Sequence, residues 1–243
     1  MKQSWVDFGN RWGPKVSMTF ALLAFIGITL SFAIPRLIRY RAVLLLVAFS
    51  YVLGPALLVN AILKETFNRP RPREIVEFKG NYAHKKVLIP GSSDFHGKSF
   101  PSGHGSAGFV LVVFYFLLKK RSRNLSWFAL ILSLSFGVYL SIVRMASGAH
   151  FFSDNLWAFA ICWFVSYFLY YRWYLKYSEK PKTAFLPSKK RWILIAGGAS
   201  SLILFIFLPF LFSDEFHQEY KNIRLPIPEG VEKIIVSGTV KNG

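Results

Sequence analysis

Residues 101–118 read PSGHGSAGFVLVVFYFLL, a polar, glycine-rich start followed by an apolar run that contains no acidic or basic residue. As an α-helix rising 1.5 Å per residue, a stretch of this length reaches about 27 Å, close to the roughly 30 Å hydrocarbon core of a bilayer. The stretch therefore predicts a transmembrane helix whose first turn places a serine, a glycine and a histidine at a membrane surface.

Similar apolar runs occupy much of the remaining chain. Of its 243 residues, 53% are hydrophobic and 18% aromatic, and the mean hydropathy is +0.37, which is typical of an integral membrane protein. Lipid offers no hydrogen-bond partner to an open strand edge, so the spans should be helices. We expect an all-α, polytopic helical bundle with six transmembrane helices and an active site at one membrane face. The six predicted spans, 17 to 22 residues long, cover residues 16–34, 42–63, 101–118, 125–143, 155–171 and 192–212.

Polar and aromatic segments flank the predicted spans. Before the first span, Trp5, Phe8 and Trp12 recur at helical spacing among polar residues, which favours an interfacial helix over a frayed polar tail. The expected organisation is an interfacial segment at 1–15, a six-helix membrane domain at 16–212 with an extramembrane loop at 65–100, and a polar tail at 213–243.

The positive charge of the chain predicts its orientation. The net charge of +18 does not indicate nucleic-acid binding, because Lys and Arg cluster at the ends of apolar runs, where they contact anionic lipid. Loops 36–41, 119–124 and 172–191 share one face with fourteen cations and one acid, a net of +13 against +5 on the other face. The positive-inside rule therefore places the termini and the 65–100 loop outside the cytoplasm. The single cysteine, Cys162, excludes an intramolecular disulfide and a cysteine metal cage.

A cleaved signal peptide is the alternative for the first span. Ser31-Phe32-Ala33 resembles a small-residue cleavage site, and cleavage there would leave five spans starting outside. The apolar run is long for a signal and continues to the proposed cut, which favours an uncleaved span.

Three short motifs lie at span ends that should share one membrane face. They are Lys64-x6-Arg71-Pro72 after the second span, Pro101-Ser102-Gly103-His104 at the start of the third, and Arg144-x5-His150-x3-Asp154 between the fourth and the fifth. Antiparallel helices would bring these distant residues into one layer. Three cations, a hydroxyl, two imidazoles and a carboxylate are the groups needed for phosphoryl transfer.

The motifs resemble the three-part signature of the type 2 phosphatidic acid phosphatase superfamily over residues 64–154. Val143 departs from that pattern, because the family usually has a serine before the arginine, and the change removes a possible phosphate hydroxyl. The resemblance implies a metal-independent membrane lipid phosphatase that forms a phosphohistidine. The 16–212 region would then be the phosphatase domain, with the 65–100 loop over its active site.

The residue types support the roles that the resemblance implies. His150 and Asp154 are four residues apart, so the carboxylate can hold one ring N–H and present the other ring nitrogen as the nucleophile. A helix N-cap is the alternative role for Asp154. His104 is expected to protonate the departing alkoxide and then to activate water. The expected phosphate-binding residues are Lys64, Arg71, Ser102, Gly103 and Arg144.

Other polar residues near the motifs are expected to take no part. Arg69 and Arg73 are predicted to be lipid anchors at a span end, and His84, His96 and His217 to be solvated loop residues. No cofactor or metal is expected, because the motif face lacks the paired carboxylates of a two-metal phosphatase.

A finer similarity within the superfamily is to bacterial lipid A phosphatases. It rests on Gly54-Pro55, Asn60, residues 69–72, residues 78–80 and residues 148–154. The additional loop cations, which suit a large anionic headgroup, are Arg69, Arg73, Lys79, Lys85, Lys86 and Lys98.

This similarity implies a phosphorylated glycolipid or phospholipid substrate in a bacterial inner membrane, with the active site facing the periplasm. The bilayer is the expected partner, and no nucleic acid or protein partner is inferred. Phosphatidylglycerophosphate phosphatases, undecaprenyl pyrophosphate phosphatases and lipid phosphotransferases share most of the pattern. A vanadium haloperoxidase, which six apolar spans argue against, and an anion transporter are the alternatives from other classes.

Overall fold

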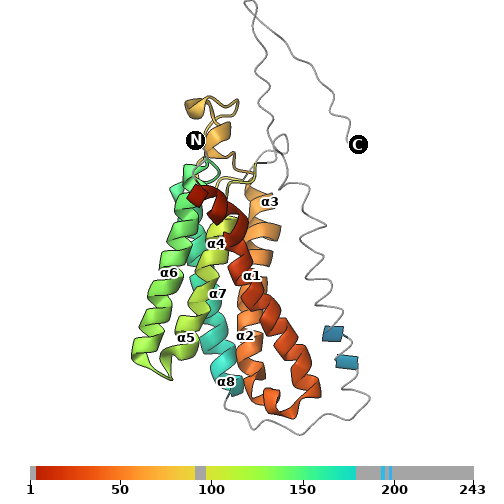
Figure 1. Ribbon diagram of the computed structural model, residues 1–243. Coiled ribbons are helices and arrows are strands. Elements are labelled where there is room, and N and C mark those ends of the chain that lie inside the picture. The colour runs from red at the N-terminus through yellow and green to blue at the C-terminus, as the bar shows by residue number, and fades with distance from the viewer. Residues whose placement is uncertain (1–3, 91–96, 179–192, 195–196, 199–243) are drawn as a thin grey trace, which may run out of the picture. The chain divides into compact units, whose positions relative to one another are not determined.

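The computed structural model describes residues 4–90, 97–178, 193–194 and 197–198 (Figure 1). These residues belong to one compact unit, Met1–Ile203, and the second unit, Leu204–Gly243, lies outside them. The regular structure of the described residues is helical, apart from one isolated bridge between Ile75 and Tyr82. The all-helical prediction is therefore confirmed for this part of the chain.

The described residues form a bundle of long helices interrupted by short 3-10 and π-helical stretches (Figure 1). In chain order the bundle contains α1 (Ser4–Ala33), η1 (Pro35–Tyr40), α2 (Arg41–Tyr51), η2 (Val52–Leu63), α3 (Lys64–Phe67), α4 (Gly103–Phe109), η5 (Val110–Val112), α5 (Val113–Lys119), α6 (Arg123–Ala146), α7 (Phe152–Phe168), η6 (Leu169–Tyr174) and α8 (Leu175–Ser178).

Most of the predicted spans coincide with apolar helices. Four helical runs within the described residues are long and apolar enough to cross a membrane, and a fifth, Gly103–Lys119, is apolar but shorter. The predicted span at 192–212 falls almost entirely outside the described residues, so the count of six stays a prediction. The four long runs are Ser4–Ala33, Pro35–Glu74, Arg123–Ala146 and Phe152–Ser178.

Helix α1 differs from the prediction of a separate segment at 1–15. It is continuous from Ser4 to Ala33, with Pro14 inside it, so the aromatic residues Trp5 and Trp12 lie on the same helix as the first span. Proline removes one backbone hydrogen bond from a helix and leaves the carbonyl four residues earlier without its usual donor. Here that carbonyl belongs to Asn10.

The middle of the bundle is held by packing between α2, α5, α6 and the α7–η6 run. Leu46, Phe116 and Tyr170 are buried there, and the ring of Phe116 lies 5.3 Å from that of Trp163. In contrast, Phe164 on α7 is 65% exposed, as expected for a side chain that faces lipid. This packing fixes the helices whose ends carry the motifs.

The three motif segments lie at one end of the bundle, where α3 ends, α4 and α7 begin and α6 ends (Figure 1). The loop after α3 carries two short 3-10 turns at the same end, η3 (Pro72–Glu74) and η4 (Val76–Phe78). The predicted convergence of the motifs on one face is therefore present in the fold.

Candidate active site

Backbone hydrogen bonds join the three motif segments directly. The N–H of Ser99 donates to the carbonyl of Arg69 at 3.0 Å, and the N–H of Ser102 donates to the carbonyl of Asp154 at 3.1 Å. The first bond joins the loop after α3 to the segment before α4, and the second joins the start of α4 to the start of α7. Residues that are more than 80 positions apart are thereby fixed in one cluster.

His150 is held by a backbone carbonyl. Its Nδ1 lies 2.5 Å from the carbonyl oxygen of Ser99, and the side chain is only 4% exposed. A carbonyl can only accept a hydrogen bond, so Nδ1 carries the proton and Nε2 keeps a lone pair. Asp154 Oδ2 lies 3.8 Å from Nδ1, beyond hydrogen-bond distance. The prediction that Asp154 itself holds the ring N–H is therefore wrong, because Ser99 occupies that position.

Asp154 is fully buried and acts through its neighbours. Its Oδ2 accepts hydrogen bonds from the hydroxyl of Ser99 at 2.6 Å and from the N–H of Phe151 at 2.9 Å, and its Oδ1 accepts one from Arg69. The N-cap of α7 is Phe151 and Asp154 is at N3, so Asp154 is not the N-cap that the alternative proposed but closes the start of the helix from N3. The carboxylate also orients Ser99, whose carbonyl orients His150.

Arg69 is not the lipid anchor that the sequence predicts. It is 4% exposed, and it donates to Asp154, to the hydroxyl of Ser153 at 2.9 Å and to the carbonyl of Lys85 at 2.9 Å. Its guanidinium carbon also lies 4.1 Å from the centre of the Phe151 ring. No cation was predicted to pair with Asp154, although a fully buried carboxylate requires one nearby. Arg73, by contrast, is exposed.

Lys64 is positioned by a side chain one turn earlier. Asn60 donates to the carbonyl of Pro55 at 2.7 Å and accepts from Lys64 Nζ at 2.7 Å. A Cβ at Gly103 would lie 2.8 Å from Asn60 Oδ1 and 3.3 Å from Lys64 Nζ. Glycine at this position therefore lets the start of α4 approach the lysine closely.

Two buried arginine nitrogens have no hydrogen-bond partner within the described part of the chain. They are Nε of Arg71 and Nε of Arg144. The like charges of these two residues act on each other, and Arg73 adds to that repulsion. Leaving such a donor unsatisfied costs about 1–3 kcal/mol or more for a charged group, so this arrangement suits an anion. Both arginines were predicted to bind phosphate.

His104 lies in the first turn of α4 and is 7% exposed. Its Nε2 is 3.2 Å from the carbonyl oxygen of Asn10 on α1, and the charges of Arg144 and Lys64 act on its ring. Ser102 caps α4 by accepting a hydrogen bond from the N–H of Gly105 at 3.1 Å, and its hydroxyl proton can still be donated. All the predicted site residues thus belong to one end of the bundle.

The protonation of His150 fits a nucleophile. Burial lowers the pKa of His150 to about 4, the neighbouring Asp154 opposes this shift, and the charges of Arg144 and Lys64 add to it. The ring is therefore neutral at pH 7.

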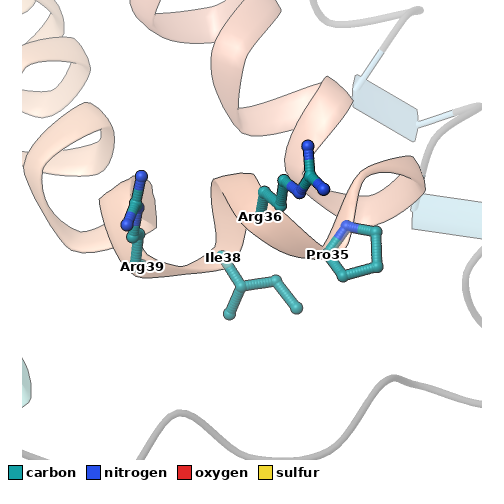
Figure 2. Close-up of a pocket in the computed structure, with 4 residues that line it drawn as sticks. All are labelled: Pro35, Arg36, Ile38 and Arg39. Carbon is teal, nitrogen blue, oxygen red and sulfur yellow. The ribbon is translucent and has the colours of Figure 1, made fainter.

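Two other features of the described residues lie outside this chemistry. No group of three or more His, Cys, Asp or Glu side chains that could hold a metal ion occurs among them, and metal independence stays a prediction. A pocket at η1 is lined by Pro35, Arg36, Ile38 and Arg39 (Figure 2). It contains none of the motif residues.

Part of the sequence is similar to a known protein. A relative named "Lipid A 4'-phosphatase", from Francisella tularensis subsp. novicida (strain U112), is 34% identical over 139 residues. The alignment covers 56% of this chain and 61% of the relative, so the chain spans about three fifths of that protein's length. No solved structure matches the chain.

The family model described as the PAP2 superfamily matches residues 42–178, more than half of the chain. The matched region includes all eight predicted site residues, from Lys64 to Asp154. The chain belongs to the PAP2 superfamily.

Proposed function

We propose that this protein is a metal-independent membrane lipid phosphatase that hydrolyses a phosphate ester through a phosphohistidine at His150. The observation that carries the proposal is the arrangement of His150 among cations. Its Nδ1 proton is held by Ser99, so the lone pair is on Nε2, while the buried Nε atoms of Arg71 and Arg144 have no partner among the described residues.

In the first step, Nε2 of His150 attacks phosphorus, and the bond between phosphorus and the ester oxygen breaks. Lys64, Arg71 and Arg144 neutralise the charge that develops on the phosphoryl oxygens. His104 gives a proton to the departing alkoxide. The phosphorylated ring keeps its Nδ1 proton and gains positive charge, which the carboxylate of Asp154 at 3.8 Å stabilises.

In the second step, the now neutral His104 takes a proton from water as that water attacks the phosphohistidine. The bond between Nε2 and phosphorus breaks, phosphate leaves, and both imidazoles return to their starting state. Ser102 and the first turn of α4 offer donors to the phosphoryl group in both steps.

Lipid A is the substrate that we propose. The alignment with a relative named for lipid A 4'-phosphatase activity supports it, as do the exposed loop cations Lys79 and Lys86. A disaccharide with two phosphates offers one to the phosphate clamp, which we define as Lys64, Arg71 and Arg144, and the other to these lysines. A phosphatidylglycerophosphate or undecaprenyl pyrophosphate phosphatase is the runner-up, followed by a lipid phosphotransferase, with an anion transporter as the remote alternative.

The proposed location is a bacterial inner membrane with the active site facing the periplasm. The cations of loops 36–41 and 119–124, which lie at the end of the bundle opposite to the motifs, support this orientation. The region 16–212 would be the phosphatase domain, with 65–100 as the loop over the site and 213–243 as a periplasmic tail.

Phosphate release by the purified protein tests the function and the substrate together. We expect release from lipid A in detergent, and none by the His150→Ala variant. A tenfold or greater preference for phosphatidylglycerophosphate or undecaprenyl pyrophosphate would contradict the choice of lipid A. Transfer of the phosphate to a lipid acceptor would indicate a phosphotransferase, and the absence of any phosphoryl chemistry would favour a transporter.

A further inference from the structure

Asn10 of α1 contacts two of the proposed active-site residues. Its side-chain oxygen accepts a hydrogen bond from Arg144 at 2.9 Å, and its backbone carbonyl lies 3.2 Å from Nε2 of His104. Because the carbonyl can only accept, Nε2 of His104 carries the proton in this pair. Asn10 lies outside residues 42–178, the part of the chain that the family model matches.

Pro14 explains why the carbonyl of Asn10 is available. In an α-helix the carbonyl of residue 10 accepts the N–H of residue 14, and proline has no N–H. The carbonyl therefore accepts from His104 without breaking a helical hydrogen bond. The spacing of Asn10 and Pro14 thus creates an acceptor on the inner side of α1.

Two glycines bring α1 close to α6, the helix that carries Arg144. A Cβ at Gly9 would lie 2.6 Å from Val143, and a Cβ at Gly13 would lie 2.2 Å from Leu140. Glycines four residues apart permit this close approach between membrane helices. Val143, the position that departs from the superfamily signature, is thus part of the surface on which α1 packs.

The structure assigns Asn10 as a positioning residue, through its contacts with His104 and Arg144, for the phosphoryl transfer proposed above, on which this assignment rests. Its carbonyl fixes the ring of His104 by Nε2, so that Nδ1 is the nitrogen that exchanges a proton with the leaving group and with water. Its side chain holds Arg144 in the orientation that binds phosphate. The two contacts have separable consequences, because only the second depends on the asparagine side chain.

The variant Asn10→Ala removes the contact with Arg144 and keeps the carbonyl. We expect the inhibition constant for vanadate, which mimics the five-coordinate phosphate, to rise about tenfold, the size expected for losing a hydrogen bond to a charged group. The kcat/KM should fall equally for an alkyl phosphate and for nitrophenyl phosphate, because both esters need the clamp.

The variant Pro14→Ala restores an N–H that competes for the carbonyl of Asn10. We expect kcat/KM to fall at least fivefold for an alkyl phosphate and less than twofold for nitrophenyl phosphate, whose leaving group needs no proton from His104. The melting temperature should stay the same or rise, because alanine is the better helix residue. A purely structural role for Pro14 predicts no dependence on the leaving group.

The matched control is Gly27→Ala on the same helix. Gly27 lies in another part of α1, where a Cβ would be 2.9 Å from Leu44 on α2. This variant therefore disturbs packing without touching the site. It should lower the melting temperature and leave the vanadate constant and the ratio between the two esters unchanged.

The reference variants His104→Ala and Arg144→Ala distinguish a wrong role for Asn10 from a wrong mechanism. If both lose activity while Asn10→Ala and Pro14→Ala keep the wild-type vanadate constant and ester ratio, the role of Asn10 is wrong and the function stands. If His104→Ala and Arg144→Ala keep near-normal activity, the proposed mechanism is wrong. If Gly27→Ala changes the ester ratio as much as Pro14→Ala does, the effect is general helix packing and the assignment of Asn10 fails.

Discussion

Arg69 donates a hydrogen bond to the carboxylate of Asp154, and the two side chains are 5% and 0% exposed. The pair joins the loop after α3 to the start of α7, beside the ring of His150. A carboxylate buried to this degree must be paired with a cation and satisfied by hydrogen bonds. The ion pair therefore stabilises the same part of the fold that orients the proposed nucleophile.

Removing Arg69 should destabilise the protein strongly. We expect Arg69→Ala to lower the free energy of unfolding by about 3 to 5 kcal/mol, because it leaves Asp154 buried without its cation. The double variant Arg69→Met with Asp154→Asn should recover much of that stability but little activity. Denaturation in detergent, followed alongside phosphate release, measures both. An Arg69→Ala protein with wild-type stability would show that the buried ion pair is not needed.

Replacing Ser99 should affect the rate more than the fold. Ser99→Ala removes the hydroxyl that donates to Asp154 and keeps the carbonyl that accepts from His150. We expect kcat to fall about tenfold with little change in KM, since the phosphate clamp is untouched. The control is Ser126→Ala, another buried serine, whose hydroxyl donates to the carbonyl of Arg123 in its own helix. Equal effects of the two substitutions would contradict a specific role for Ser99.

The buried state of His150 predicts the acid side of the pH profile. Because burial lowers its pKa to about 4, the ring stays neutral and nucleophilic well below pH 6.5, and kcat/KM should fall only as the pH approaches 4. Stability should change with pH in the same direction. The ring binds a proton near pH 6.5 in the unfolded protein but only near pH 4 in the folded protein. The free energy of unfolding that depends on the neutral ring is therefore fully present above pH 6.5 and is lost as the pH falls toward 4. An acid limb of kcat/KM centred near pH 6.5 would contradict this.

The motif residues were predictable because their spacing is local and the spans are antiparallel. Lys64, His104, Arg144 and His150 each stand at the end of an apolar run, and the runs alone place these ends together. The helical bundle follows from the same runs.

The supporting residues were not predictable from such patterns. Arg69 pairs with a residue 85 positions away, Ser99 with one 55 positions away, and Asn10 with one 134 positions away. Their positions depend on how the helices pack, which no local periodicity encodes. Two signals were present: a buried aspartate requires a cation, and Pro14 leaves the carbonyl of Asn10 without its helical donor. Neither signal identifies its partner residue from the sequence alone.

Cysteine labelling tests the orientation of the bundle. We expect a cysteine at Lys79 to react with an impermeant maleimide in intact cells and one at Arg121 to react only after permeabilisation, because cation-rich loops are retained in the cytoplasm. The native Cys162 is fully buried and provides the unlabelled background. The reverse pattern would place the active site at the cytoplasmic face.

Trapping the covalent intermediate tests whether His150 is the nucleophile. When the His104→Ala variant is mixed with an activated phosphate ester, it should accumulate phosphate on His150, because phosphorylation of a good leaving-group ester needs no acid and hydrolysis of the intermediate needs a base. Peptide mapping by mass spectrometry after a rapid quench identifies the modified residue. We expect phosphate on His150 alone and none on the His150→Ala variant. Phosphate on another residue, or near-normal phosphate release by His150→Ala, would contradict it.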